Sequence, residues 1–408
     1  MNVNEISFIM PSHNTLNYTM MAYHSIRKYY PANEIIILDD GSDDGSWEWT
    51  EEQAKLDDNL RVWHNESKAI VGHTTTYGIG IRMCRGPLFS IFHSDMILGR
   101  GYLENMLKHW KPKTVICATR VEPEGIYPPG KEKELRPFGS YYYDFKQEEF
   151  DKFVEKELIS SKDRVTYGSF APWCMKKEEF IQVFGDHDIT SFAPFSEEDA
   201  DIFLRFTLAG YKLIQSRDSL VWHFISRSHR NWAQNGIGKD GPMFQFYQNR
   251  ARRNYIRKWR KWMQFDEWHH PISHKVFRVG FVVTNVTTID FLHAIEPWAS
   301  HVYVDNMKIA KEYLAKEQLT TNVDLTPRII DSKDDDVTKL IPSFVPDDVL
   351  LTFSENDFKA NINGNMRVII NLTDILSNDI DNNSDFEYGI FKMKTGTLND
   401  ISKTLIKI

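Results

Sequence analysis

Short apolar runs alternate with segments of helical spacing along the first 120 residues of this chain. The apolar runs predict buried strands at 6–10, 34–38, 61–65, 87–92 and 114–120. Helical spacing of apolar residues is found at 16–29, 46–56, 73–84 and 101–110. Strands that are apolar throughout and separated by helices predict an α/β fold, with a mostly parallel sheet covered by helices on both faces. We expect Pro11 to end the first strand.

The following part combines a long loop with further helices and a strand. Residues 121–145 are rich in Pro, Gly and Tyr and predict a loop that covers a site. Helices are expected at 147–160, 176–184 and 198–209, a turn at GDHD (185–188), and a strand over 211–224.

The alternation restarts after a boundary near residues 265–275. Further apolar runs are RVGFVVTN, HVYVDN, PRIIDS, DVLLTF, RVIINLTD and EYGIFKMK, with helices expected at 289–299, 306–318 and 396–407. We therefore expect a first domain over residues 1–268 and a second, smaller α/β domain over residues 275–408. The second domain has no glycine-rich phosphate loop and no paired catalytic residues in its sequence.

Composition narrows the classes of protein that fit. The chain has 408 residues and a net charge of −8, so non-specific binding of nucleic acid by the whole protein is not expected. Its three cysteines lack C-x-x-C spacing, which argues against a zinc site or a disulfide framework and fits a reducing compartment. We find neither the pattern of a signal peptide nor a run of 18 apolar residues, and we expect a soluble, cytoplasmic protein.

Two adjacent carboxylates, Asp39 and Asp40, follow the second predicted strand in ILDDGSDDGS. A carboxylate at this place can accept the imide N–H of uracil or thymine, or the N1–H of guanine. Gly41 allows the backbone to approach a ring closely. Asp, Gly and Ser are equally typical of turns, so these residues alone leave both interpretations open.

Asp95 follows the fourth predicted strand in FHSDM. A carboxylate there can bind a divalent cation that neutralises a diphosphate leaving group. His93 lies two residues away on the same face of an extended segment, so both side chains can point at one metal ion. The alternative is that Asp95 only helps to start the next helix.

Acidic residues open the helix expected at 198–209, in the sequence SEED. Preferences at helix N-termini explain part of this motif, and Asp201 with Arg205 is a structural i,i+4 pair. Those preferences do not require both Glu198 and Asp199. We expect one of them to point back to the site as a general base.

His223 ends the strand predicted before the basic region, in VWHF. A lone histidine is more often structural than a ligand, but this position suits a further metal ligand or a diphosphate contact. A ligand set of carboxylate and imidazole would favour manganese over magnesium.

A basic and aromatic segment runs from Ser226 to Trp262, with ten Lys or Arg residues and one acid. Its first part can contact a diphosphate, and GIGKDG at 236–241 is typical of a flexible lid. The later residues form either a solvated helix face, which we favour, or a surface for a polyanion such as anionic lipid or nucleic acid. These residues are Arg252, Arg253, Arg257, Lys258, Arg260 and Lys261.

With these motifs in this order, the first 265 residues resemble family 2 glycosyltransferases of the GT-A fold, a Rossmann-like α/β fold. IMPSHN is similar to that family's first strand and turn, and ILDDGS to its nucleotide-binding motif. HSD stands in the place of its Asp-x-Asp, GDHD and EED resemble its acceptor-side motif, and VWH its late histidine. One departure is that His93 replaces the first Asp of Asp-x-Asp. Residues 275–408 fall outside the resemblance.

The resemblance implies an inverting, metal-dependent transferase that moves a sugar from a nucleotide-diphosphate sugar to a hydroxyl of a glycan or other acceptor. The implied roles are catalysis by Asp199 and Glu198, nucleotide binding by Pro11, His13, Asn14, Asp39, Asp40 and Ser94, Mn²⁺ or Mg²⁺ binding by Asp95, His223 and His93, and diphosphate contacts by Arg227, His229 and Arg230.

Two other functions stay open. One is a glycosyltransferase that acts on hydroxylated bases of nucleic acid and holds the strand with residues 226–262. The other is a non-catalytic module that binds a nucleotide or a glycan. The sequence does not specify the donor base, the sugar, the acceptor or the oligomeric state.

Overall fold

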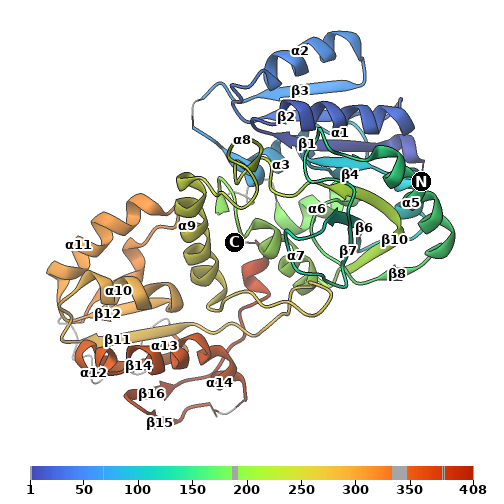
Figure 1. The fold of residues 1–408 in the computed structure, drawn as a ribbon. Helices are drawn as coiled ribbons and strands as arrows, with labels where there is room; N and C mark the ends of the chain where they lie inside the picture. The colour runs from blue at the N-terminus through green and yellow to red at the C-terminus, as the bar shows by residue number, and fades with distance from the viewer. Residues whose placement is uncertain are drawn as a thin grey trace. The chain divides into compact units, whose positions relative to one another are not determined.

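A computed structural model describes residues 2–67, 69–185, 192–332, 347–378, 380 and 382–407. The chain forms two compact units (Figure 1). The first comprises the residues up to Gln248 together with Gln264–Ile272, and the second comprises Asn249–Met263 and Ser273–Ile406. None of the helices in the described ranges has the length and apolar character needed to cross a membrane.

The first unit is built on a mostly parallel sheet, as expected, to which short antiparallel strands are added. The strand order is β3 (Leu60–His64), β2 (Ile35–Asp39), β1 (Ile6–Ser12), β4 (Leu88–Ile91), β9 (Trp173–Lys176), β6 (Thr114–Pro123), β10 (Lys212–His223) and β5 (Met96–Leu98). β7 (Lys133–Arg136) pairs with β6, and β8 (Val165–Thr166) pairs with β10. Every residue of β1, β2 and β4 is buried, as expected of strands covered on both faces.

The principal strands of this sheet share one direction. β3, β2, β1 and β4 pair in parallel, and β6 pairs in parallel with β10. β9 is antiparallel to both β4 and β6, so β4 and β6 also run the same way. The carboxyl ends of six strands therefore lie along one edge of the sheet, where ligands bind in such folds.

The helices of the first unit agree closely with the predicted segments. They are α1 (Leu16–Tyr29), α2 (Ser46–Leu56), α3 (Gly72–Met83), α4 (Tyr102–Leu107), α5 (Gln147–Ser160), α6 (Lys177–Phe184), α7 (Glu198–Leu208), α8 (Trp232–Asn235) and α9 (Pro242–Trp259). α9 belongs to the first unit up to Gln248 and to the second from Asn249. In the predicted GDHD turn, residues 186–188 lie outside the described residues.

Two details of the first unit differ from the prediction. β1 continues through Pro11, which pairs with Leu38, because pairing with β4 already ends at Ile9 and no neighbour on that side needs the missing N–H of proline. The segment predicted as a loop over 121–145 begins with the end of β6 and contains β7.

The second unit is a smaller α/β unit, as expected from the sequence. Its sheet order is β13 (Ile329–Asp331), β12 (His301–Val304), β11 (Val279–Thr284), β14 (Val349–Ser354), β16 (Phe391–Thr395) and β15 (Asp385–Tyr388). The first four strands are parallel, and β16 and β15 form an antiparallel edge. Its helices include α10 (Ile289–Ile295), α11 (Met307–Glu317), α12 (Glu355–Ala360), α13 (Ile362–Ile370) and α14 (Leu372–Asn378).

Two predicted elements of the second unit are wrong. RVIINLTD is helical and lies in α13 and α14. The Asn361 side chain caps the start of α13 by accepting a hydrogen bond from the Gly364 N–H, and Ile369 of this helix packs in the core. The helix expected at 396–407 is reduced to a short 3₁₀ turn at Thr404–Lys407. There the Ile401 N–H bonds to the Val276 carbonyl instead of a helical partner.

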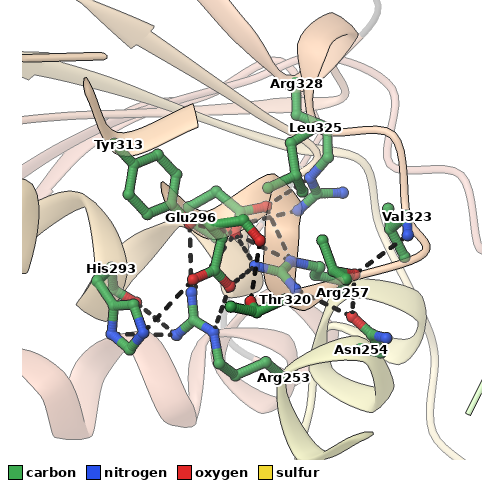
Figure 2. Close-up of polar contacts among 12 residues, drawn as sticks. Arg253, Asn254, Arg257, His293, Glu296, Tyr313, Thr320, Val323, Leu325 and Arg328 are labelled. Atoms are coloured by element: carbon green, nitrogen blue, oxygen red, sulfur yellow. Dashed lines mark hydrogen bonds and ion pairs between the residues drawn. The ribbon is translucent and has the colours of Figure 1, made fainter. Parts of the chain in front are cut away.

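Basic residues in the second half of α9 are used in contacts inside the second unit (Figure 2). Arg257, whose side chain is 1% exposed, donates to Glu296 at 2.8 Å and to Glu317 at 2.5 Å. Arg253 donates to Glu317 at 2.7 Å, and Arg328 donates to Glu296 at 2.6 Å. Arginines from distant parts of the chain therefore converge on two buried carboxylates.

Two further basic residues behave in the same way. Arg260 donates to the Ser300 hydroxyl at 3.3 Å, and Lys261 pairs with Asp374 at 2.6 Å. The interpretation of Arg253, Arg257, Arg260 and Lys261 as a solvated helix face is therefore wrong. The polyanion surface loses its main cations as well, because charges held in internal ion pairs are not free to bind phosphates.

The stability of the second unit should fall as the pH is lowered from about 4.5 towards 2. Burial would raise the pKa of Glu296, but Arg328 and Arg257 outweigh it and lower that pKa to about 2. Because the pKa of Glu296 is lower in the folded than in the unfolded state, its ionised form stabilises the fold at pH values above the unfolded-state pKa. This contribution, on the order of 3 kcal/mol, is lost as the pH falls through the folded-state pKa.

Hydrogen exchange of the β11 and β12 amides at several pH values would measure this loss. Glu296→Gln is the matched control, because it keeps the shape of the side chain but cannot titrate. An equally steep pH dependence in the wild-type protein and in Glu296→Gln would contradict the assignment.

Candidate functional site

A cavity of about 1000 Å³ lies at the carboxyl edge of the first sheet. His93 and Asp95 reach it from the segment between β4 and β5, and His223 from the end of β10. Asp199 reaches it from the first turn of α7, and Arg120 from β6. The fold thus brings three of the four sequence motifs singled out above into one cavity.

His93, Asp95 and His223 form a cluster with the donor set of a metal site. One potential ligand atom from each residue lies within 4.8 Å of the others. His223 is placed opposite Met96 by the antiparallel pairing of β10 with β5, and its Nε2 lies 3.7 Å from Asp95 Oδ1. Asp95 is further fixed by the Arg227 backbone N–H, which donates to its Oδ2 at 3.2 Å.

His93 is held in place by its aromatic neighbours. Its Nε2 lies 2.5 Å from the Tyr77 hydroxyl, and its ring stacks on that of His73 with centroids 5.3 Å apart. Burial, followed by the charge of His73, holds the pKa of His93 well below its usual value. The ring is therefore neutral at physiological pH, which is the form that can bind a metal.

Glu122, which the sequence analysis missed, supports this cluster from behind. Its Oε1 lies 2.9 Å from His223 Nδ1, which leaves Nε2 of that ring directed to Asp95. Burial would raise the pKa of Glu122, but the hydrogen bond with His223 and the charges of Arg120 and Lys133 lower it to about 2. A carboxylate behind a histidine is the usual second layer of a metal site, since it fixes the tautomer and orients the ring.

Glu122→Gln should weaken Mn²⁺ binding roughly 10- to 100-fold while the fold is retained. The amide can still contact His223 but no longer supplies the negative charge that strengthens its Nε2 as a ligand. Isothermal titration with Mn²⁺ measures this change. Glu134→Gln, on neighbouring β7, is the control, and equal affinities in the two variants would contradict the role of Glu122.

Asp199 and Glu198 lie side by side at the start of α7 with unused acceptor atoms. Asp199 Oδ1 and Glu198 Oε2 are buried, and neither has a hydrogen-bond partner among the described residues. Burial and the charge of Glu198 raise the pKa of Asp199 to about 7. Asp199 can therefore exchange a proton near neutral pH, as a general base must.

His73, from the first turn of α3, was not singled out from the sequence. Its Nδ1 lies 3.7 Å from Glu198 Oε1. Burial lowers the pKa of His73, but the interactions with Glu198 and the charge of Asp199 outweigh it, so that the pKa is raised. His73 belongs to no motif in the sequence, and only its position close to Glu198 in the fold indicates a role.

Asp39 and Asp40 differ in how many of their carboxylate oxygens are used in hydrogen bonds. Asp40 accepts hydrogen bonds from Asn65, Val71 and Gly72 at 2.7–3.0 Å, and both of its oxygens are occupied. Asp39 Oδ2 accepts from the Ser42 N–H and contacts His64 Nδ1 at 2.8 Å. Its Oδ1 is buried without a hydrogen-bond partner in the described part of the chain.

Gly72 shows how closely the site is packed. Its φ is +77°, and a Cβ atom added there would lie 1.4 Å from the carbonyl oxygen of Pro194. The same residue donates its N–H to Asp40. Only glycine therefore allows the start of α3 to approach Pro194, in the segment before α7, this closely.

A second, much narrower cavity adjoins the first. Pro11, His73, Ser228 and His229 line both cavities, so they share a wall. His13, Asp40 and the first residues of α9, Met243 and Phe244, line the second. The predicted nucleotide residues Pro11, His13 and Asp40 thus lie on one hollow, next to the metal cluster.

The remaining predicted residues lie around these cavities. Asn14 accepts from the Asp43 N–H, and Ser94, which lines the first cavity, lies 3.2 Å from the Thr15 hydroxyl. His229 lines both cavities, and Arg230 lines the first while pairing with Asp240 at 2.9 Å. The Arg227 side chain is fully buried and donates to the Ser140 carbonyl, and neither cavity has it in its lining.

Comparisons with known proteins agree with these motifs. Residues 7–164 match the family model described as glycosyl transferase family 2. The glycosyltransferase GlyG of Streptococcus pneumoniae serotype 4 is 31% identical over 109 residues, which are 26% of this chain and 36% of that protein. EpsH of Bacillus subtilis is 34% identical over 115 residues, which are 28% of this chain and 33% of that protein. The matched part thus spans about a third of each relative.

Two solved structures share a more distant likeness. They are GalNAc-T7 with UDP, GalNAc and Mn²⁺ (19% identity, TM-score 0.45, 62% of this chain and 47% of that chain) and the mannosyltransferase PcManGT from Pyrobaculum calidifontis with GDP-Man and Mn²⁺ (14% identity, TM-score 0.40, 62% of this chain and 63% of that chain). At these TM-scores the likeness supports no assignment of residues. The expected α/β fold is present, and residues 7–164 of this chain match glycosyl transferase family 2.

Proposed function

We propose that this protein is an inverting, metal-dependent glycosyltransferase that uses a nucleotide-diphosphate sugar as donor. The observation that carries the proposal is one cavity that holds both a His-Asp-His cluster and a partly buried carboxylate, Asp199, with a pKa raised to about 7. A metal site beside a general base is what transfer from a diphosphate requires. The family 2 match over residues 7–164 supports the same class of reaction.

The donor would lie along the wall shared by the two cavities. His93, Asp95 and His223 fit Mn²⁺. A ligand set of two imidazoles and one carboxylate favours Mn²⁺ over Mg²⁺, because Mg²⁺ prefers oxygen ligands alone. When bound, the ion would supply positive charge to the diphosphate that leaves.

Asp39 would recognise the base through its free Oδ1, which accepts an N–H of uracil, thymine or guanine. Its side chain is fully buried, so its surroundings would have to rearrange before a base could reach it.

Asp199 would act on the acceptor. Its carboxylate takes the proton of an acceptor hydroxyl, whose oxygen attacks the anomeric carbon from the face opposite the diphosphate. The new C–O bond forms as the bond from that carbon to the diphosphate oxygen breaks, and the nucleoside diphosphate leaves with the electron pair. Glu198, next to Asp199, keeps the pKa of the base high by its negative charge.

Thermal unfolding with UDP, GDP, CDP and dTDP, each with Mn²⁺ or with EDTA, tests donor binding. A ligand at about 100 times its dissociation constant adds roughly 2.7 kcal/mol to the stability of the unit that binds it. We expect a rise in Tm with one nucleotide that EDTA removes. A Tm that no nucleotide changes would contradict donor binding and would leave a non-catalytic glycan-binding module as the alternative.

The nucleic-acid alternative has less support than it had from the sequence. It relied on residues 226–262, and Arg253, Arg257, Arg260 and Lys261 are engaged inside the second unit. Without those cations, the steep salt dependence typical of nucleic-acid binding is not expected.

A further inference from the structure

Arg120 is a buried cation in the larger cavity for which the reaction proposed above has no use. It lies on β6, and its side chain is 13% exposed. In the strand it precedes Glu122 by two residues, so both side chains lie on the same face of the sheet. Arg120 lines the same cavity as the metal cluster and Asp199.

The guanidinium of Arg120 has unused hydrogen-bonding capacity. Its Nε is buried without a hydrogen-bond partner and lies 3.5 Å from Glu122 Oε1, too far and too poorly aligned for a hydrogen bond. Glu122 is already in contact with His223 at 2.9 Å and with Lys133 at 3.2 Å. Among the described residues, none accepts a hydrogen bond from Arg120, although a guanidinium carries five donors.

Arg120 lies near both the metal cluster and the base. Its charge lowers the pKa of His93 and opposes the rise in the pKa of Asp199. The donor diphosphate belongs to the His93, Asp95 and His223 cluster. The acceptor must bring a hydroxyl to Asp199, so a group carried by the acceptor can reach Arg120 from the same side.

Aromatic side chains complete this part of the cavity. Tyr127 stacks on Trp232 with centroids 6.2 Å apart, and Phe170 lies 4.8 Å from the ring of His269. Tyr127, Phe170 and His269 line the same cavity as Arg120. Flat apolar faces beside a cation suit a ring that has an apolar face and carries a negative charge.

We propose that Arg120 binds an oxyanionic group of the acceptor, a carboxylate or a phosphate on the sugar whose hydroxyl Asp199 deprotonates. The inference rests on the proposed glycosyltransferase function and adds the chemical class of its acceptor, an anionic sugar. The planar fork of the guanidinium matches two oxygens of a carboxylate or a phosphate, and burial in the cavity strengthens the pair. Only an anionic acceptor forms an ion pair with Arg120, so the preference over neutral sugars comes from this added attraction.

Isothermal titration of the full chain, saturated with Mn²⁺ and the nucleotide that raises its Tm, tests the proposal. The probes are methyl β-glucuronide, methyl β-glucoside and glucose 6-phosphate, which separate a carboxylate from a neutral group and from a phosphate. We expect one anionic probe to bind at least roughly 10-fold more tightly than the glucoside. Arg120→Gln should lose about 10- to 100-fold in affinity for that probe, and Arg120→Lys should lose less because it keeps the charge.

Two controls keep the result interpretable. Arg100→Gln removes an exposed arginine from the same unit and should leave all affinities unchanged. The rise in Tm with nucleotide and Mn²⁺ should persist in Arg120→Gln, which shows that the donor site is intact, whereas its absence in the wild-type protein would count against the proposed function itself.

Equal or undetectable binding of the three probes to the wild-type protein would overturn the assignment of Arg120. So would an equal loss of glucoside and anion binding in Arg120→Gln. Competition by an oligonucleotide with a hydroxymethylated base, in the absence of any effect of the sugars, would also overturn it and would point to a nucleic-acid acceptor.

Discussion

Replacing Asp199 with Asn should lower the rate of sugar transfer about 10²- to 10⁴-fold, the usual contribution of a general base. The amide keeps the shape of the carboxylate but cannot take a proton from the acceptor hydroxyl. Donor binding should stay nearly intact, because the metal cluster and the nucleotide residues are on other elements. Initial rates and nucleotide-induced shifts in Tm, measured on the same preparation, separate the two effects.

The pH dependence of the same reaction provides a second test of Asp199. Burial and the charge of Glu198 raise its pKa to about 7, so the carboxylate is mostly protonated at pH 6 and mostly ionised at pH 8. Because the base acts in its ionised form, kcat should rise with pH through this range. Glu198→Gln should shift the rise to lower pH by removing the neighbouring charge. A flat profile, or an Asp199→Asn variant that keeps most of its turnover, would contradict the assignment.

Replacing Asp95 with Asn should lower the affinity for Mn²⁺ by at least roughly 100-fold, more than the loss of a supporting residue costs. The amide oxygen can still accept the Arg227 N–H, so the local backbone should hold. Asp95 is the one carboxylate of the described cluster, so the variant keeps only the two imidazoles as strong ligands. The rise in Tm that depends on both nucleotide and Mn²⁺ should disappear together with transfer.

Asp163→Asn is the matched control for this substitution. Asp163 is an exposed residue of the same unit that pairs with Lys108 at 2.7 Å. Removing that charge should change neither metal affinity nor transfer. If Asp95→Asn binds Mn²⁺ as tightly as the Asp163→Asn control, the His-Asp-His cluster is not the metal site.

Much of the first unit was predictable because its strands are apolar throughout and its helices have clear spacing. The helices over 16–29, 46–56 and 147–160 agree with α1, α2 and α5. The antiparallel strands β5, β8 and β9 were not predicted, because they have only three, two and four residues. RVIINLTD was predicted as a strand because its apolar and branched residues are typical of strands. The cap at Asn361, which lies before this run, starts a helix instead.

The candidate site divides in a similar way. HSD, EED and VWH were visible because each stands at the end of a strand or the start of a helix, where a polar side chain reaches the sheet edge. Arg120 was missed because it ends a predicted apolar strand, and Glu122 because it fell in the segment predicted as a loop; the importance of both comes from their neighbours in the fold. The basic residues of α9 were misread because their acidic partners, Glu296 and Glu317, lie far along the chain.

The release of nucleoside diphosphate from a panel of UDP-, GDP- and dTDP-sugars, followed with Mn²⁺ and with EDTA, tests the central claim most directly. The proposed function predicts that the wild-type protein consumes one donor, that EDTA and Asp95→Asn stop the reaction, and that Asp199→Asn slows it by at least about 100-fold. Release of the nucleotide at the same rate by the wild-type protein and by both variants would contradict it.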